Sequence, residues 1–141
     1  MTKKIKSEQE MLSFAEEFAR TLPLPSIIEL VGDVGAGKTT FTRGLAMGLG
    51  IEEPVTSPSF TISKRYYFEK AKTPCTLIHY DFYRLSDPGL MSEDLQESIS
   101  DPHAITIVEW ADSVSDILPV NRITLKISIN PDSTRTIERL N

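Results

Sequence analysis

Residues 32–39 read Gly32-Asp33-Val34-Gly35-Ala36-Gly37-Lys38-Thr39, which is the phosphate-binding pattern G-x-x-x-x-G-K-[ST]. A short apolar run at residues 27–31 leads into this stretch, and a helix-like segment from Thr39 to Leu49 follows it. Strand, glycine loop and helix are the context in which this pattern binds phosphate. We therefore expect a loop that binds a nucleoside triphosphate; the alternative is a chance glycine turn with a solvated lysine.

The residue types in this stretch explain how it would hold an anion. Glycines let the backbone turn so that several N–H groups point at one anion, and the start of the following helix adds partial positive charge. Lys38 would reach the β- and γ-phosphates, and the Thr39 hydroxyl would bind Mg²⁺.

The pattern along the rest of the chain predicts an α/β fold. Ser7 to Glu10 has the spacing of a helix capping box, and apolar residues at helical spacing follow it as far as Leu22. Strands are expected at residues 26–31, 61–68, 76–82, 104–108, 122–129 and 134–140, and short helices at 92–99 and 111–118. The second and third of these strands form a predicted antiparallel hairpin. We expect residues 1–141 to form a single P-loop NTPase domain, three-layered, with a mixed, mostly parallel sheet.

Composition restricts the classes of function. The chain of 141 residues is 40% hydrophobic and carries a net charge of −5. This acidic charge argues against direct, tight nucleic-acid binding, which needs a basic surface. Cys75 is the single cysteine and cannot form an internal disulfide, and no stretch has the pattern of a signal peptide or a membrane span. We therefore expect a cytoplasmic protein.

Two carboxylates are candidates for chemistry beside the phosphate loop. Glu109 follows the apolar strand 104–108, at the end where α/β sheets bind ligands. This resembles a Walker B arrangement with Glu on the metal side; the alternative is an ordinary acid at the end of a strand. Asp81 shares a strand face with His79. From the residues alone, a role for Asp81 in the site and a salt bridge with Arg84 are equally supported.

Two further features near the expected site are also open to two interpretations. The hydroxyl-rich loop 56–61 lies where GTPases have a switch whose hydroxyl binds Mg²⁺. The alternative is that this loop is only a connector bounded by prolines, because the same residues are typical of such a connector. Trp110 follows Glu109, so strand alternation places its ring on the opposite face. We expect Trp110 to pack in the core, with contact to the nucleotide as the alternative.

Missing motifs favour ATP over GTP. The chain has neither the Asn/Thr-Lys-x-Asp motif that reads guanine nor an Asp-x-x-Gly motif after the predicted hairpin. It also lacks an obvious arginine-rich lid, so hydrolysis without an arginine from a partner should be slow.

Four stretches occur together in the order and spacing of a known family. They are residues 32–40, 56–60, 79–85 and 108–112, which read GDVGAGKTT, TSPSF, HYDFYRL and VEWAD. In these stretches the chain resembles the TsaE (YjeE) family, the small bacterial ATPase of tRNA threonylcarbamoyladenosine synthesis. Many families share the phosphate loop, whereas the H-x-D-x-Y-R-L and E-W elements on one short chain are much more specific.

The resemblance implies a protein that binds ATP and Mg²⁺, hydrolyses ATP and works with two larger partners, TsaB and TsaD. These partners carry the threonylcarbamoyl transfer to adenosine 37 of tRNA. Thr39 and Glu109 would hold the metal, and Asp81 would be an essential acid near the γ-phosphate. The expected catalytic residues are Lys38, Asp81 and Glu109.

The resemblance also implies contacts to the rest of the nucleotide. Ser7 and Glu8 match a segment that lies near the adenine in this family, and Arg135 matches an arginine that can reach the nucleotide. The phosphates would contact Gly35, Ala36, Gly37, Lys38, Thr39 and Thr40. The chain departs from the family pattern at Ser59, where Thr is usual, and at Ala111, where Pro is frequent.

Two other functions stay open on the residues alone. A small P-loop metabolite kinase would share the phosphate loop, although 141 residues leave little room for an acceptor-binding segment and a lid. A nucleotide-sensing adaptor would bind ATP and a partner with negligible turnover.

Overall fold

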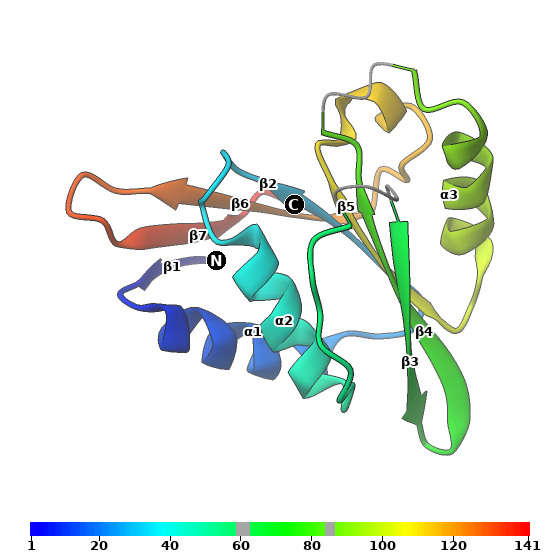
Figure 1. Cartoon of the computed structure of the whole chain (residues 1–141), viewed down its shortest axis with the longest axis horizontal. Helices are drawn as coiled ribbons and strands as arrows, with labels where there is room; N and C mark the ends of the chain where they lie inside the picture. Colours follow the sequence, from blue (N-terminus) through cyan, green and yellow to red (C-terminus); the bar gives the residue numbers. More distant parts are fainter. Residues whose placement is uncertain (59–62, 84–86) are drawn as a thin grey trace.

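The structure is a computed structural model that describes residues 1–58, 63–83 and 87–141. Within these residues the chain forms a seven-stranded sheet with helices on both faces (Figure 1). The strands are β1 (Thr2–Ile5), β2 (Ser26–Val31), β3 (Ser63–Lys70), β4 (Thr73–Asp81), β5 (Ala104–Glu109), β6 (Ile123–Ile129) and β7 (Arg135–Arg139). The helices are α1 (Glu8–Thr21), α2 (Lys38–Gly48), α3 (Leu90–Ser100) and the 3₁₀ helix η1 (Ala111–Val114).

The centre of the sheet is parallel and both edges are antiparallel. The strand order is β1-β7-β6-β2-β5-β4-β3. β2 pairs in parallel with β5 and β6, and β4 pairs in parallel with β5. β3, β7 and β1 add antiparallel pairs at the edges. This topology confirms the predicted α/β P-loop fold, with its mixed, mostly parallel sheet and antiparallel hairpin.

Helices α1 and α2 lie side by side on one face of the sheet (Figure 1). The Ser7 hydroxyl caps α1 by accepting a hydrogen bond from the Glu10 N–H at 3.1 Å, as the capping-box spacing predicts. Gly44 of α2 lies where the helices touch, because a Cβ on it would be 2.8 Å from the Cβ of Ala15. The contact buries Phe41 completely and sets the position of the first turn of α2, directly after the phosphate loop.

The other face of the sheet is covered only in part. Leu95 of α3 and the residues Val114 and Leu118 pack there with apolar side chains of β4 and β5. Lys126 of β6 is exposed on this face, since its neighbours Leu125 and Ile127 belong to the core beneath α1 and α2. The third layer therefore covers one half of the sheet.

Two elements differ from the sequence prediction. The pattern does not predict β1, because this strand is four residues long and buries Ile5 alone. A helix is expected over 111–118, whereas the structure forms the shorter η1 over Ala111–Val114. Among the helices of the described residues, none has the length and apolar character needed to cross a membrane.

Candidate functional site

The loop between β2 and α2 has a backbone that only glycine adopts without strain. Gly35 has φ +82° and Gly37 has φ +115°, both in the left-handed region. At Gly32 the requirement is space, because a Cβ there would lie 2.6 Å from the Ile127 carbonyl oxygen. The Ala36 N–H closes the turn onto the Asp33 carbonyl at 3.0 Å. The loop therefore has the tight glycine turn and the helix N-terminus that the sequence predicts for an anion-binding site.

Lys38, the first residue of α2, is folded back across this loop and is only 7% exposed. Its ammonium donates to the Gly32 carbonyl at 2.5 Å and lies 3.8 Å from Glu109 Oε1. It also lies 4.0 Å from the centre of the Trp110 ring. The ammonium thus has three partners within the protein, and a bound phosphate would compete with them.

Glu109 and Asp81 lie opposite each other at the ends of adjacent parallel strands, β5 and β4. This is the carboxyl edge of the parallel strands, at which α/β folds bind ligands. A pocket of about 380 Å³ opens there, with Lys38, Thr39 and Ser57 also on its wall. The structure therefore brings the predicted catalytic residues and the predicted metal-binding residues to one pocket beside the phosphate loop.

His79 is a further member of this site, and the sequence pattern alone does not assign it a role. Its side chain is fully buried, and its Nε2 lies 2.5 Å from Glu109 Oε2. Its Nδ1 has no hydrogen-bond partner among the described residues. The signal that could have revealed it is its position two residues before Asp81 on the same strand face, directed at the strand that carries Glu109.

The Asp81 carboxylate is partly buried and accepts a hydrogen bond from the Tyr83 N–H at 2.9 Å. Burial raises the pKa of the Asp81 carboxyl, and the charge of nearby Glu109 adds to this rise against the opposing Tyr83 hydrogen bond. The alternative of a salt bridge with Arg84 falls outside the described residues. The switch-like loop is described only in part, because Ser59, Phe60 and Thr61 also fall outside the described residues. The departure from the family pattern at Ser59 therefore stays untested.

The prediction that Trp110 packs in the core is wrong. Strand β5 ends at Glu109, and Trp110 takes a left-handed backbone with φ +56°, so strand alternation no longer decides where its ring points. The ring is partly exposed, lies 4.7 Å from the Tyr83 ring centre and forms part of the pocket wall. Trp110 therefore lies on the wall of the pocket beside the phosphate loop, and its contact with a nucleotide stays a prediction.

The residues expected near the adenine gather on the other side of the loop. A pocket of about 210 Å³ lies there, and its wall includes Ser7, Glu8, Gly35, Ala36, Gly37, Thr40 and Arg135. The Arg135 guanidinium donates to the Ala36 carbonyl at 3.1 Å and to the Gly35 carbonyl at 3.3 Å. The Ser7 hydroxyl already accepts the capping hydrogen bond from the Glu10 N–H. The Glu8 carboxylate forms an ion pair with Arg43, with 3.7 Å between Oε1 and Nη1.

The donor atoms in the phosphate pocket fit Mg²⁺ in its usual mode of binding. Thr39, Asp81 and Glu109 offer hydroxyl and carboxylate oxygens at one pocket. The described part of the chain holds no cluster of three or more His, Cys, Asp or Glu that would form a metal cage of its own. Mg²⁺ commonly binds through one or two protein oxygens together with substrate phosphates and water, so this sparse oxygen set suits it.

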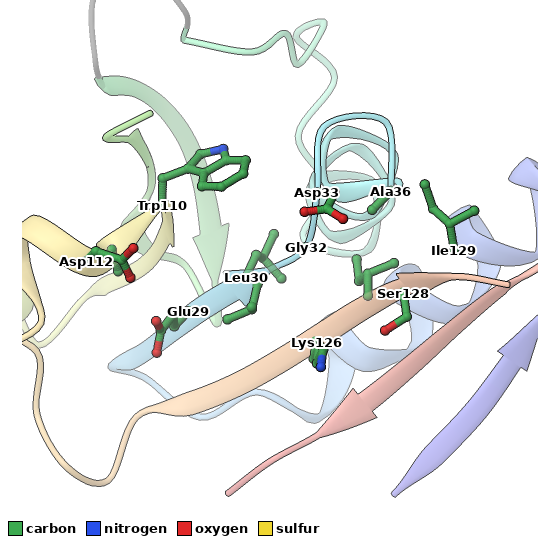
Figure 2. Close-up of a pocket in the computed structure, with 13 residues that line it drawn as sticks. Glu29, Leu30, Gly32, Asp33, Ala36, Trp110, Asp112, Lys126, Ser128 and Ile129 are labelled. Atoms are coloured by element: carbon green, nitrogen blue, oxygen red, sulfur yellow. The ribbon is translucent and has the colours of Figure 1, made fainter. Parts of the chain in front are cut away.

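A third pocket, of about 510 Å³, lies on the uncovered face of the sheet (Figure 2). Lys126 and Ser128 of β6 lie on its floor, and Asp33 and Trp110 lie at the end nearest the phosphate loop. The sequence does not predict this pocket, because it results from the half of the sheet that no helix covers.

Comparison with known proteins agrees with this arrangement. The family model described as "Threonylcarbamoyl adenosine biosynthesis protein TsaE" matches residues 5–137. The chain is 33% identical over 133 residues to the "tRNA threonylcarbamoyladenosine biosynthesis protein TsaE" of Treponema pallidum, covering 94% of both chains. It is 33% identical over 143 residues to the protein of the same name from Haemophilus influenzae, covering 98% of this chain and 87% of that one. The crystal structure of Bacillus subtilis YdiB is similar with a TM-score of 0.80 at 32% identity, covering 99% of this chain and 83% of that one.

Proposed function

Since the chain belongs to the TsaE family of tRNA threonylcarbamoyladenosine biosynthesis, we propose that it is a Mg²⁺-dependent ATPase that acts on partner proteins in that modification. We propose TsaB and TsaD homologues as these partners, and adenosine 37 of tRNA as the base that the partners modify. The net charge of −5 supports an action through partners, because the chain has no excess of basic residues with which to hold tRNA itself.

The observation that carries the proposal is the convergence of Lys38, Thr39 and Glu109 at one pocket. On ATP binding, the Lys38 ammonium would leave the Gly32 carbonyl and bind the β- and γ-phosphates. The loop N–H groups and the start of α2 would hold the remaining phosphate charge. The nucleoside would extend into the second pocket, toward Ser7, Glu8 and Arg135.

Thr39 and Glu109 would hold Mg²⁺, which when bound neutralises charge on the β- and γ-phosphate oxygens. Asp81 would orient a water molecule for attack on the γ-phosphate, and its position beside Glu109 on the neighbouring strand supports this role. The raised pKa of Asp81 brings it closer to the working pH than an ordinary carboxyl, which suits a group that accepts a proton.

Slow turnover by the isolated chain is part of the proposal. The pocket wall contains Lys38 as its only basic side chain among the described residues. P-loop enzymes that lack an arginine at the transferred phosphate turn over slowly until a partner supplies one. We therefore expect hydrolysis to rise when the partners are present.

The test is ATP turnover by the full chain, measured with and without purified TsaB and TsaD homologues. We expect Mg²⁺-dependent turnover that the partners stimulate and that Lys38→Ala and Glu109→Ala abolish. Lys72→Ala, which removes an exposed charge in the β3–β4 turn, is the matched control and should behave as the wild type. Turnover that needs a small-molecule acceptor would favour a metabolite kinase, and binding without turnover under all conditions would favour an adaptor.

A further inference from the structure

We propose that His79 is a positioning residue that holds one oxygen of Glu109, so that the other oxygen stays directed at the phosphate pocket. The inference rests on the proposed function and deepens it, because it assigns a role to a residue that would touch neither the nucleotide nor the metal.

The two oxygens of the Glu109 carboxylate have different partners. Oε2 lies 2.5 Å from His79 Nε2 on the inner side, and Oε1 lies 3.8 Å from the Lys38 ammonium on the pocket side. Glu109 is only 4% exposed, so solvent does not replace a lost partner easily. The orientation of the carboxylate is therefore set by one fixed contact and one contact to a residue that nucleotide binding would move.

The surroundings of His79 decide which nitrogen carries the hydrogen. A carboxylate accepts, so Nε2 must donate to Glu109. Nδ1 is buried without a partner among the described residues, so no contact competes with Glu109 for the choice of tautomer. The hydrogen bond to Glu109 thus selects the tautomer, and in turn the fixed ring orients the carboxylate.

Apolar packing does not explain a histidine at this position. The side chain is fully buried on the face that also carries Leu77, and one of its ring nitrogens is unsatisfied. A leucine would fill the same face without a buried polar atom. What the leucine could not do is donate to Glu109, so the contact between the two side chains is the feature that requires the histidine.

The role of His79 would appear when ATP draws the Lys38 ammonium away from Oε1. Without His79, the carboxylate would then keep neither of these two contacts and could rotate away from the metal. With His79, Oε2 stays bound and Oε1 keeps its direction. Side chains that orient a metal ligand through a hydrogen bond typically contribute about 10- to 100-fold to metal affinity.

The test uses the full chain with His79→Leu and His79→Gln. ATP binding is measured by calorimetry in EDTA and then across a Mg²⁺ titration. His79→Leu should bind ATP in EDTA like the wild type, but its half-saturating Mg²⁺ concentration should rise by about 10- to 100-fold. His79→Gln retains an N–H near the position of Nε2 and should recover most of this loss.

Tyr80→Phe is the matched control, because Tyr80 is the next residue of β4, is fully buried and faces away from the site. Its hydroxyl bonds Asp94 and Ser98, so the variant loses stability without touching Glu109. The Mg²⁺ response of Tyr80→Phe should match that of the wild type. A folded His79→Leu with the wild-type Mg²⁺ response, or an equal loss in Tyr80→Phe, would overturn the role of His79.

Two further results keep the inference separate from folding and from the proposed function. In the wild-type protein, nitrogen NMR of the His79 ring should show a hydrogen on Nε2 before and after Mg²⁺ and ATP are added. An Nε2 without a hydrogen would overturn the inference, because it could not donate to Glu109, even if the variants do not fold. A wild-type protein without Mg²⁺-dependent ATP binding would refute the proposed function itself.

Discussion

Neutralising either member of the buried Lys38–Glu109 pair should destabilise the nucleotide-free protein by about 2–4 kcal/mol. The two charges lie 3.8 Å apart, with side chains 7% and 5% exposed. At an effective dielectric constant of about 20, this separation corresponds to an attraction of about 4 kcal/mol, and breaking a buried pair typically costs about 3–5 kcal/mol. We expect a loss about 1 kcal/mol below this range, because Lys38 keeps the Gly32 carbonyl and Glu109 keeps His79.

The double variant separates this electrostatic coupling from lost packing. Lys38→Met and Glu109→Gln each leave one buried charge without its partner, whereas together they leave none. The double variant should therefore be only slightly less stable than the less damaging single variant, with a coupling of about 2–3 kcal/mol. The assay is urea unfolding of all four proteins in buffer without nucleotide or Mg²⁺.

The Arg20–Glu16 pair is an exposed control within the same molecule. It has a similar separation of 3.1 Å, but its side chains are 61% and 34% exposed, so its coupling should be about 0.3–0.5 kcal/mol and should weaken with salt. The Lys38–Glu109 coupling should persist in high salt, because salt screens buried charges much less. Additive single-variant effects at Lys38 and Glu109, within about 0.5 kcal/mol, would refute the reasoning.

Three further variants test other parts of the structure. Gly44→Ala should lower the free energy of unfolding, measured in urea, by about 1–3 kcal/mol, because the new Cβ would lie 2.8 Å from the Cβ of Ala15. A gain in stability, which alanine gives at an exposed helix position, would contradict the close contact between the helices. Asp81→Asn should abolish turnover yet raise the thermal unfolding midpoint at pH 7, because the raised pKa of Asp81 means that its ionised carboxyl destabilises the folded state. This gain in midpoint should vanish below about pH 4, where the carboxyl is protonated in the folded and the unfolded state. Arg135→Ala should lower the affinity for ATP, measured by calorimetry, about tenfold, because two phosphate-loop carbonyls lose a charged donor. An unchanged affinity would show that Arg135 is not part of the site.

The sequence predicts most of the fold because its strongest signals are local. The glycine loop, the helix cap at Ser7 and the strand at Ser26–Val31 each depend on neighbouring residues, and the structure confirms all three. The Glu10 carboxylate accepts from the Lys6 N–H and not from the Ser7 N–H, so the reciprocal half of a capping box does not form. β1 is missed because its stability comes from pairing with β7, which lies more than a hundred residues away. The uncovered half of the sheet is missed for a similar reason, since periodicity does not show which face a helix covers.

The candidate site is predictable where a strand carries its residues and unpredictable where the strand ends. Glu109 and Asp81 are placed correctly at the carboxyl edge, because alternation holds up to the last strand residue. Trp110 is misplaced because its left-handed backbone interrupts the alternation one residue later. Strand alternation places His79 on the same face as Asp81, but it does not show that His79 contacts Glu109, because that contact crosses between two strands.

The most direct test of the account is calorimetric titration of ATP into the full chain in the presence of Mg²⁺. We predict saturable binding of one ATP per chain that is lost in Lys38→Ala and retained in Lys72→Ala. No heat of binding in the folded wild-type protein, or equal binding by Lys38→Ala, would contradict the conclusion that the loop at residues 32–39 holds a nucleotide.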